Sequence, residues 1–182
     1  PALGSRISTP ATGPATVGVN WSDTVHEAPA ASVVQVALPP KAALTISLAS
    51  IATNAGRVST AIGNASPSKP RVLIFAQIKM GTGPNANGTV ELYLIRGDAA
   101  SPNIQDDNAG AVDAAYTAVN AQFIGTLRNP DATTGNVLRG SFVVDEPGLL
   151  WSIGVKNLSG VALDATGSNH VVRYQYVNPE VQ

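Results

Sequence analysis

The feature that most constrains the fold of this chain is a series of short β-type runs, separated by segments rich in Gly, Pro, Asn and Ser. Turn residues on both sides of a run of β-branched and other apolar residues are typical of a strand. About eight such runs occur, at residues 33–38, 43–52, 72–80, 89–96, 121–127, 137–144, 150–158 and 170–177. The sequence therefore predicts about eight strands.

Several runs alternate between apolar and polar side chains, as half-buried antiparallel strands do. The reason is that successive side chains of a strand point to opposite faces of the sheet. The run at 43–52 alternates in this way, and in the run at 150–158 Trp151 shares a face with Ile153 and Val155. This pattern gives each strand one core face and predicts that Trp151 is a core residue.

The connections between the runs favour antiparallel pairing. Residues 81–88 (GTGPNANG) join two strong runs with residues that tolerate positive φ, and no alternation of strands and helices indicates a parallel sheet. In 109–120, Gly110 and the β-branched residues disfavour a helix, so we expect a loop with at most a helical turn. The prediction is an all-β, antiparallel two-sheet sandwich of jelly-roll type, with an immunoglobulin-like sandwich as the alternative.

The chain divides into an arm and a domain. Residues 1–31 carry repeated Gly and Pro and show no sustained period of 2 or 3.6, which predicts an extended N-terminal arm, and residues 32–182 form the sandwich domain. Within the arm, Trp21, with Val19 and Val25 nearby, is a candidate anchor on a neighbouring subunit, because Trp is enriched at the energetic centres of interfaces. Cover of the end of its own sandwich is an equally good interpretation of Trp21.

Composition argues against catalysis. The 182 residues include no Cys, two His and one Met, and only 13% are charged. Catalytic sites draw mainly on His, Cys, Lys and carboxylates held close together, and here these residues are scattered. We therefore expect a structural or binding protein and not an enzyme. Without Cys there are no disulfides, so stability outside a cell has to come from packing or assembly.

Charge and hydropathy limit the partners. The net charge is −1 and the eleven Lys and Arg never cluster along the sequence, which argues against direct binding of nucleic acid. The apolar runs are much shorter than the about 20 residues of a membrane span, so we expect a soluble protein without a membrane partner. Pro1 fits a mature start after loss of an initiator Met, which predicts synthesis in the cytoplasm.

The best candidate metal site is an acidic loop. Asp106, Asp107 and Asp113 lie in it, and calcium prefers such oxygen ligands. Their spacing differs from that of the EF-hand loop, and a solvated acidic loop explains them without a metal, so no metal or cofactor is expected. His26 and His170 have no further ligands at metal-binding spacing, and His170 is expected to be an ordinary hydrogen-bonded residue at a strand start.

Two short motifs admit a functional and a structural interpretation. Arg96-Gly97-Asp98 is the tripeptide that integrins read on flexible loops, but here it ends a strand and enters a turn, where Gly and Asp are expected in any case. Triplets of the form Asn-x-Ser/Thr begin at Asn20, Asn64, Asn87 and Asn157. They would suggest glycans in a secreted protein, but a chain rich in Asn, Ser and Thr forms them by chance. We prefer the structural interpretation for both.

Two segments resemble known proteins. Thr89 to Asp98 (TVELYLIRGD) and Trp151 to Gln182 (WSIGVKNLSGVALDATGSNHVVRYQYVNPEVQ) are similar to small virion structural proteins of tailed bacteriophages. The resemblance covers roughly residues 71–182 and rests on general sequence texture. It implies a head decoration (cement) protein, which is β-rich, oligomeric and bound outside the major capsid protein shell, and it assigns no role to any single residue.

The predicted function is that of a non-enzymatic virion structural protein that binds and stabilises a phage capsid. The expected partner is the major capsid protein, the expected location is the capsid surface, and the expected unit is a homo-oligomer, most simply a trimer. A tail or fibre component, or a carbohydrate- or receptor-binding sandwich, is the alternative. Sugar-binding modules usually cluster aromatic residues, and the four tyrosines do not cluster in the sequence, at Tyr93, Tyr116, Tyr174 and Tyr176.

Overall fold

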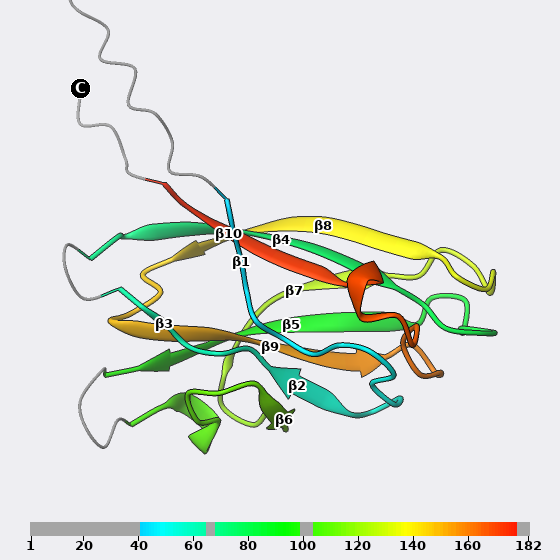
Figure 1. Ribbon diagram of the computed structural model, residues 1–182, viewed down its shortest axis with the longest axis horizontal. Helices are drawn as coiled ribbons and strands as arrows, with labels where there is room; N and C mark the ends of the chain where they lie inside the picture. The colour runs from blue at the N-terminus through cyan, green and yellow to red at the C-terminus, as the bar shows by residue number, and fades with distance from the viewer. Residues whose placement is uncertain (1–40, 65–67, 99–103, 178–182) are drawn as a thin grey trace, which may run out of the picture. The chain divides into compact units, whose positions relative to one another are not determined.

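The computed structural model describes residues 41–64, 68–98 and 104–177. They form two antiparallel sheets packed face to face (Figure 1), which confirms the predicted all-β sandwich. Sheet A has the strand order β1 (Ala42–Ala43), β10 (Val171–Val177), β4 (Arg71–Lys79) and β8 (Val137–Asp145). Sheet B has the order β6 (Ala114–Tyr116), β2 (Gly56–Val58), β9 (Leu150–Leu158), β5 (Thr89–Gly97) and β7 (Gln122–Arg128), and β3 (Ile62–Gly63) pairs with the start of β9.

The main strand pairs are nested in the sequence. β5 pairs with β7, β4 with β8, β2 with β9 and β1 with β10, so each pair encloses the one before it. Successive pairs alternate between sheet B and sheet A. The chain is therefore folded like a long antiparallel hairpin that is wound across the two layers.

No helix among the described residues is long and apolar enough to cross a membrane.

The core lies between the two sheets and is built from the alternating apolar positions. Trp151, Ile153 and Val155 of β9 are fully buried, which confirms the prediction for Trp151. They pack beside the inward residues of β5 in the same sheet and against those of β4 in the opposite sheet. These side chains are also 0 to 4% exposed, namely Val72, Ile74, Ala76, Ile78, Val90, Leu92 and Leu94. Burying a side chain of this size contributes roughly 1.5–3 kcal/mol.

The strand predicted at 43–52 is wrong in its extent, although its alternation is correct. Only Ala42–Ala43 pairs as a strand, but Leu44 and Leu48 are buried in the core as expected. The reason is that the chain crosses between layers here: the Leu44 amide donates to a carbonyl of β10, and the Thr45 carbonyl accepts from a residue between β2 and β3. The run at 33–38 and the arm at 1–31 lie outside the described residues.

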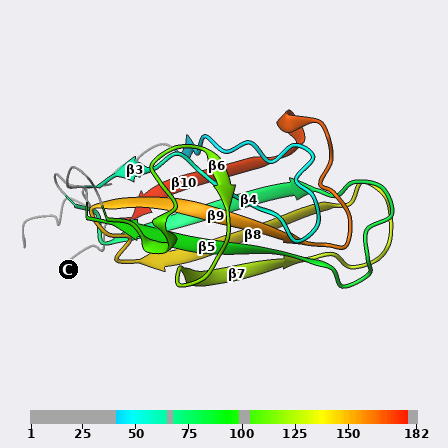
Figure 2. The ribbon, with the colours of Figure 1, turned by 90° about the horizontal axis from the view of Figure 1, so that it is seen from below.

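A second, smaller cluster covers the outer face of sheet B. Val58 of β2 and Ile95 of β5 are buried there together with Tyr116, which belongs to the covering segment 104–121. Figure 2 shows this segment crossing β9 and β5. This segment contains a 3-10 turn, η1 (Asp106–Asn108), and the short strand β6. The expectation of a loop at 109–120 is therefore right for most of that stretch, but the helical turn lies before it and a three-residue strand lies within it.

Candidate functional site

The outer face of sheet A carries side chains in transverse rows. Antiparallel register places residues of β10, β4 and β8 opposite one another, and the two central rows are Val171, Gln77 and Arg139, and Arg173, Phe75 and Ser141. These side chains point away from the core, because the residues that alternate with them along each strand face inward. The two rows line an open groove of about 470 Å³.

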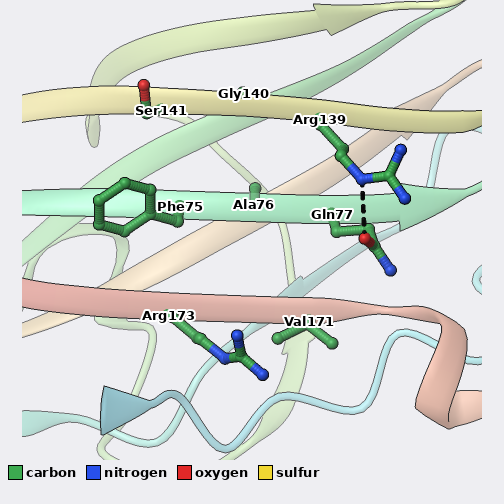
Figure 3. A pocket seen from close by; sticks show the side chains of 8 residues that line it. All are labelled: Phe75, Ala76, Gln77, Arg139, Gly140, Ser141, Val171 and Arg173. Atoms are coloured by element: carbon green, nitrogen blue, oxygen red, sulfur yellow. Dashed lines mark hydrogen bonds between the residues drawn. The ribbon is translucent and has the colours of Figure 1, made fainter. Parts of the chain in front are cut away.

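Two arginines from different strands line this groove. Figure 3 shows Arg139 of β8 and Arg173 of β10 on either side of β4, with the Phe75 ring in the same groove. Arg139 Nε donates to Gln77 Oε1 at 2.9 Å, which holds that side chain across the sheet. Guanidinium groups present planar sets of N–H donors that match carboxylate and phosphate oxygens.

A third cation adds to the positive charge of the groove. Lys41 Nζ lies 4.5 Å from the centroid of the Phe75 ring, within the range of a cation–π contact. Lys41, Arg139 and Arg173 are all exposed, and none of them forms an ion pair with a described residue. We call these three cations together with Phe75 and Gln77 the basic groove. Its chemistry suits an anionic group, above all a carboxylate.

The predicted acidic loop uses Asp107 to hold the segment 104–121 closed. Its carboxylate accepts four hydrogen bonds, from Tyr116 Oη and from the amides of Val119, Asn120 and Ala121, at 2.5 to 3.1 Å. Burial alone would raise the pKa of Asp107, but these hydrogen bonds outweigh it and lower the pKa. The carboxylate is thus a structural acceptor that remains ionised.

The other two aspartates of that loop have separate partners. Asp106 Oδ2 accepts from the Arg96 amide, and Asp113 accepts from Arg57 Nε at 2.6 Å and from Ser47 Oγ. The pKa of Asp113 is lowered, because the bonds from Arg57 and Ser47 outweigh the effect of burial. Among residues 41–64, 68–98 and 104–177, no three His, Asp or Glu residues gather in a group that could hold a metal ion.

The Arg96-Gly97-Asp98 tripeptide lies at the end of β5, an interior strand of sheet B. Gly97 ends β5, and Arg96 Nε donates to the Glu146 carbonyl at 2.9 Å, so the guanidinium is tied to the loop after β8. Asp98 Oδ1 accepts from the Ile104 amide. These contacts agree with the structural interpretation of the tripeptide.

His170 is hydrogen-bonded at the start of β10, as predicted. It is 9% exposed, its Nε2 lies 2.8 Å from the Asp164 carbonyl oxygen, and its Nδ1 accepts from the Lys79 amide at 3.4 Å. Nε2 is then the nitrogen that carries the proton. His26 lies outside the described residues, as do Trp21, Val19 and Val25 of the candidate interface.

The tyrosines gather in the fold although they do not in the sequence. Tyr174 and Tyr176 pack edge-to-face on Trp151, whose Nε1 donates to Tyr176 Oη at 3.1 Å, so this group belongs to the core. Tyr93 and Tyr116 lie on the outer face of sheet B with ring centroids 6.3 Å apart. Burial, followed by the hydrogen bond to Glu91, raises the pKa of Tyr93 to about 12.

Two of the Asn-x-Ser/Thr triplets begin at buried asparagines. Asn157 is fully buried, and its Nδ2 donates to the Ile51 and Val161 carbonyls. Asn64 is 6% exposed, and its Nδ2 donates to the Lys69 and Gly148 carbonyls. Their amide groups are part of the folded core, so neither side chain can carry a glycan in this fold.

Comparisons with protein-family models, with curated proteins and with solved structures found no match to this chain. The evidence for the basic groove as a binding site is therefore its geometry. Sequence reasoning missed it because its cations come from residues 41, 139 and 173, which are far apart in the chain. The available signal was the position of Arg139 and Arg173 on the polar side of two alternating strands.

Proposed function

We propose that this chain is a non-enzymatic virion structural protein that binds the surface of a phage capsid and stabilises it, with the basic groove as its contact surface. The observation that carries the proposal is an open sheet face with exposed Lys41, Arg139 and Arg173, which form no ion pair with a described residue. Such a face suits a broad protein surface better than a small molecule. Its partner would be the major capsid protein, through exposed carboxylates.

The stabilising effect follows from mass action. A protein that binds the assembled lattice better than the separated subunits shifts the equilibrium toward the lattice. Each exposed ion pair contributes only about 0.2–1 kcal/mol, but the contact is repeated at every copy around the shell. The particle then resists separation of its subunits under the pressure of packaged DNA.

The nested strand pairs support the jelly-roll form of the sandwich. Leaving aside the short β3 and β6, eight strands pair as β1–β10, β2–β9, β4–β8 and β5–β7, in alternating sheets. Jelly rolls consist of eight strands in two sheets and occur in viral capsid proteins and lectins. The fold is thus compatible with a capsid role and equally with a sugar-binding role.

A carbohydrate- or receptor-binding module, or a tail or fibre component, is the second candidate. Phe75 lies in the groove with Gln77 and Ser141, and an aromatic ring among polar groups is a common setting for sugar recognition. However, Lys41 Nζ sits over the Phe75 ring, which is the face that a sugar would stack against. This contact favours the anionic partner.

The test is rebinding of purified protein to particles stripped of it. Lys41→Glu/Arg173→Glu should bind about tenfold more weakly, since two charge attractions become repulsions. Binding of the native chain should weaken as salt rises. Arg128→Glu, an exposed arginine on β7 of sheet B, is the matched control and should bind normally. Particles with rebound native protein should release DNA at a higher temperature than stripped ones.

Two results would contradict the proposal. Unchanged rebinding by the double variant would remove the basic groove from the contact. Equal thermal stability of particles with and without the protein, together with loss of host-cell attachment in its absence, would favour the receptor-binding candidate.

A further inference from the structure

The outer edge of β8 is the longest edge without a register shift among the described strands. Exposed edges attract other strands, and proteins blunt them by shortness, bulges, Pro or charged side chains, especially Lys. β1 has two residues, β6 has three, and β7 carries a bulge where Leu92 and Tyr93 pair with it. β8 has nine residues in unbroken register with β4, and its sequence, VLRGSFVVD, contains neither Pro nor Lys.

The direction of the backbone groups of β8 follows from its hydrogen bonds at both ends. The Asn136 carbonyl accepts from Met80 and the Glu146 amide donates to Pro70, so even-numbered residues bond toward β4. In an antiparallel sheet, the amides and carbonyls of the odd-numbered residues then point to the open side. Among the described residues, only the Asp145 carbonyl accepts a hydrogen bond on this side, from Arg96 Nη2 at 3.4 Å.

The same odd-numbered residues place their side chains on the outer face of sheet A. Val137, Arg139, Ser141, Val143 and Asp145 are exposed, and Val143 keeps 58% of its surface accessible. Along this edge, Arg139 and Asp145 stand six residues apart with an uncharged stretch between them. Asp145 Oδ1 accepts from Arg71 Nε of β4 at 2.5 Å, which leaves Oδ2 of the exposed carboxylate for a second cation. This arrangement is self-complementary under a two-fold rotation.

We propose that β8 pairs antiparallel with β8 of a second copy of this chain. The register that matches charge sets Arg139 opposite Asp145 of the partner subunit, and Ser141 opposite Val143 of the partner subunit. Both pairings recur by symmetry. Directly opposed residues of such a pair lie about 5.5 Å apart at Cα, close enough for an ion pair. About eight backbone hydrogen bonds form, because the Asp145 carbonyl has a second lone pair.

The pairing joins the two copies of sheet A into one continuous sheet. Its two-fold axis is perpendicular to that sheet, so the basic grooves of both copies face the same side. Because Arg139 pairs with Asp145 of the partner subunit in this dimer, Lys41 and Arg173 of each copy remain as the cations of that face. Two such pairs on one face would bind a capsid surface with the gain in avidity that linked sites provide. A closed two-fold pairing predicts a dimer, where the sequence predicts a trimer.

The experiment uses purified full-length protein and does not depend on capsid binding. Arg139→Glu places Glu opposite Asp145 of the partner subunit, and Asp145→Lys places Lys opposite Arg139 of the partner subunit. Each variant alone should dimerise at least tenfold more weakly, since two attractive pairs become repulsive. An equimolar mixture of the two variants should recover the native dimer affinity, because the heterodimer contains Glu–Lys and Arg–Asp pairs only. Sedimentation velocity across a dilution series measures these masses.

A backbone test complements the charge test. Ser141→Pro removes an outward amide that the edge uses in pairing and should abolish the dimer, while Pro is tolerated at an edge position whose amide faces solvent. Circular dichroism and a native tryptophan emission spectrum, to which the buried Trp151 contributes, check that the variant is folded. Arg128→Glu is the charge control and should leave the dimer intact.

The outcomes separate the possible occupants of the edge. A native monomer at all concentrations, a trimer mass, or single variants that dimerise like the native chain would each overturn the proposal. Loss of the dimer in Trp21→Ala, with full dimerisation of Ser141→Pro, would assign association to the N-terminal segment instead. An intact dimer with failed particle binding by Arg173→Glu would leave this proposal standing and bear only on the capsid contact.

Discussion

Replacing Asp107 by Asn should loosen the segment 104–121 from sheet B while the sandwich stays folded. The segment covers the small cluster around Tyr116, and Asp107 is the group that ties its two ends together. Oδ2 accepts three hydrogen bonds and Oδ1 accepts one from the Asn120 amide. In Asn, the remaining oxygen can serve the three donors, but the amide nitrogen then faces another donor.

The magnitude follows from those four bonds. A hydrogen bond to a charged acceptor contributes about 1.5–3 kcal/mol and a neutral one about 0.5–1.5. Losing one bond and weakening three would cost about 4 kcal/mol in a dry site, but water can reach the exposed residues Val119 and Asn120, so we expect about 2 kcal/mol. Asp107→Ala should cost at least about 1 kcal/mol more, because Ala also loses the three hydrogen bonds that Asn keeps. In addition, φ at this residue is 58°, a conformation that Asn tolerates better than Ala.

Hydrogen exchange at the amides of residues 119 and 121 measures the effect directly, since local opening is separate from global unfolding. A loss of about 2 kcal/mol corresponds to roughly 30-fold less protection, while exchange in β9 should be unchanged. Asp106→Asn is the matched control, because among the described residues the Asp106 side chain accepts one hydrogen bond, from the Arg96 amide. Protection of residues 119 and 121 within twofold of the native value in Asp107→Asn would refute the reasoning.

Three further perturbations test the fold. The pKa values of Asp107 and Asp113 are lowered in the folded chain, so ionisation of these carboxylates stabilises the fold above the unfolded pKa of about 4. This stabilisation is lost as the pH falls through the lower folded values. The urea midpoint should therefore drop on acidification, and it should drop less in Asp107→Asn. Asn157→Ala removes the donor to the Ile51 and Val161 carbonyls and the acceptor of the buried Ser159 amide, and should cost about 3 kcal/mol in thermal unfolding. Gly154→Ala brings a Cβ within 2.5 Å of the Tyr116 ring and should cost about 2 kcal/mol, mainly as faster exchange in the segment 104–121.

The long strands were predictable because their alternation is local. The runs at 89–96 and 150–158 lie within one residue of β5 and β9, since each strand carries its own pattern of core-facing residues. The short strands β2, β3 and β6 could not be found in this way. Each has two or three residues, and their pairing partners lie far along the chain, so no periodic pattern can form within them.

The acidic loop illustrates a different limit. The sequence offers Asp106, Asp107 and Asp113 as candidate oxygen ligands and predicts no metal, but it does not say which donors will surround each carboxylate. In the fold, backbone amides of the loop and Tyr116 surround Asp107, while Arg57 reaches Asp113 from β2. Carboxylates that fix loops and carboxylates that bind metals look alike until the donors around them are placed.

The basic groove follows from the way in which the fold distributes charge. A net charge of −1 indicates balance, but balance over a whole chain says nothing about each face. Many acidic side chains here are engaged within loops or at strand ends, as Asp107, Asp131 and Asp164 are with amides of their own loops. Acidic side chains that accept hydrogen bonds within their own loops do not reach the middle of sheet A, where Arg139 and Arg173 lie on neighbouring rows. A chain can therefore be nearly neutral and still carry a cationic face, and pairing through β8 would set Lys41 and Arg173 of two copies on the same side of one sheet.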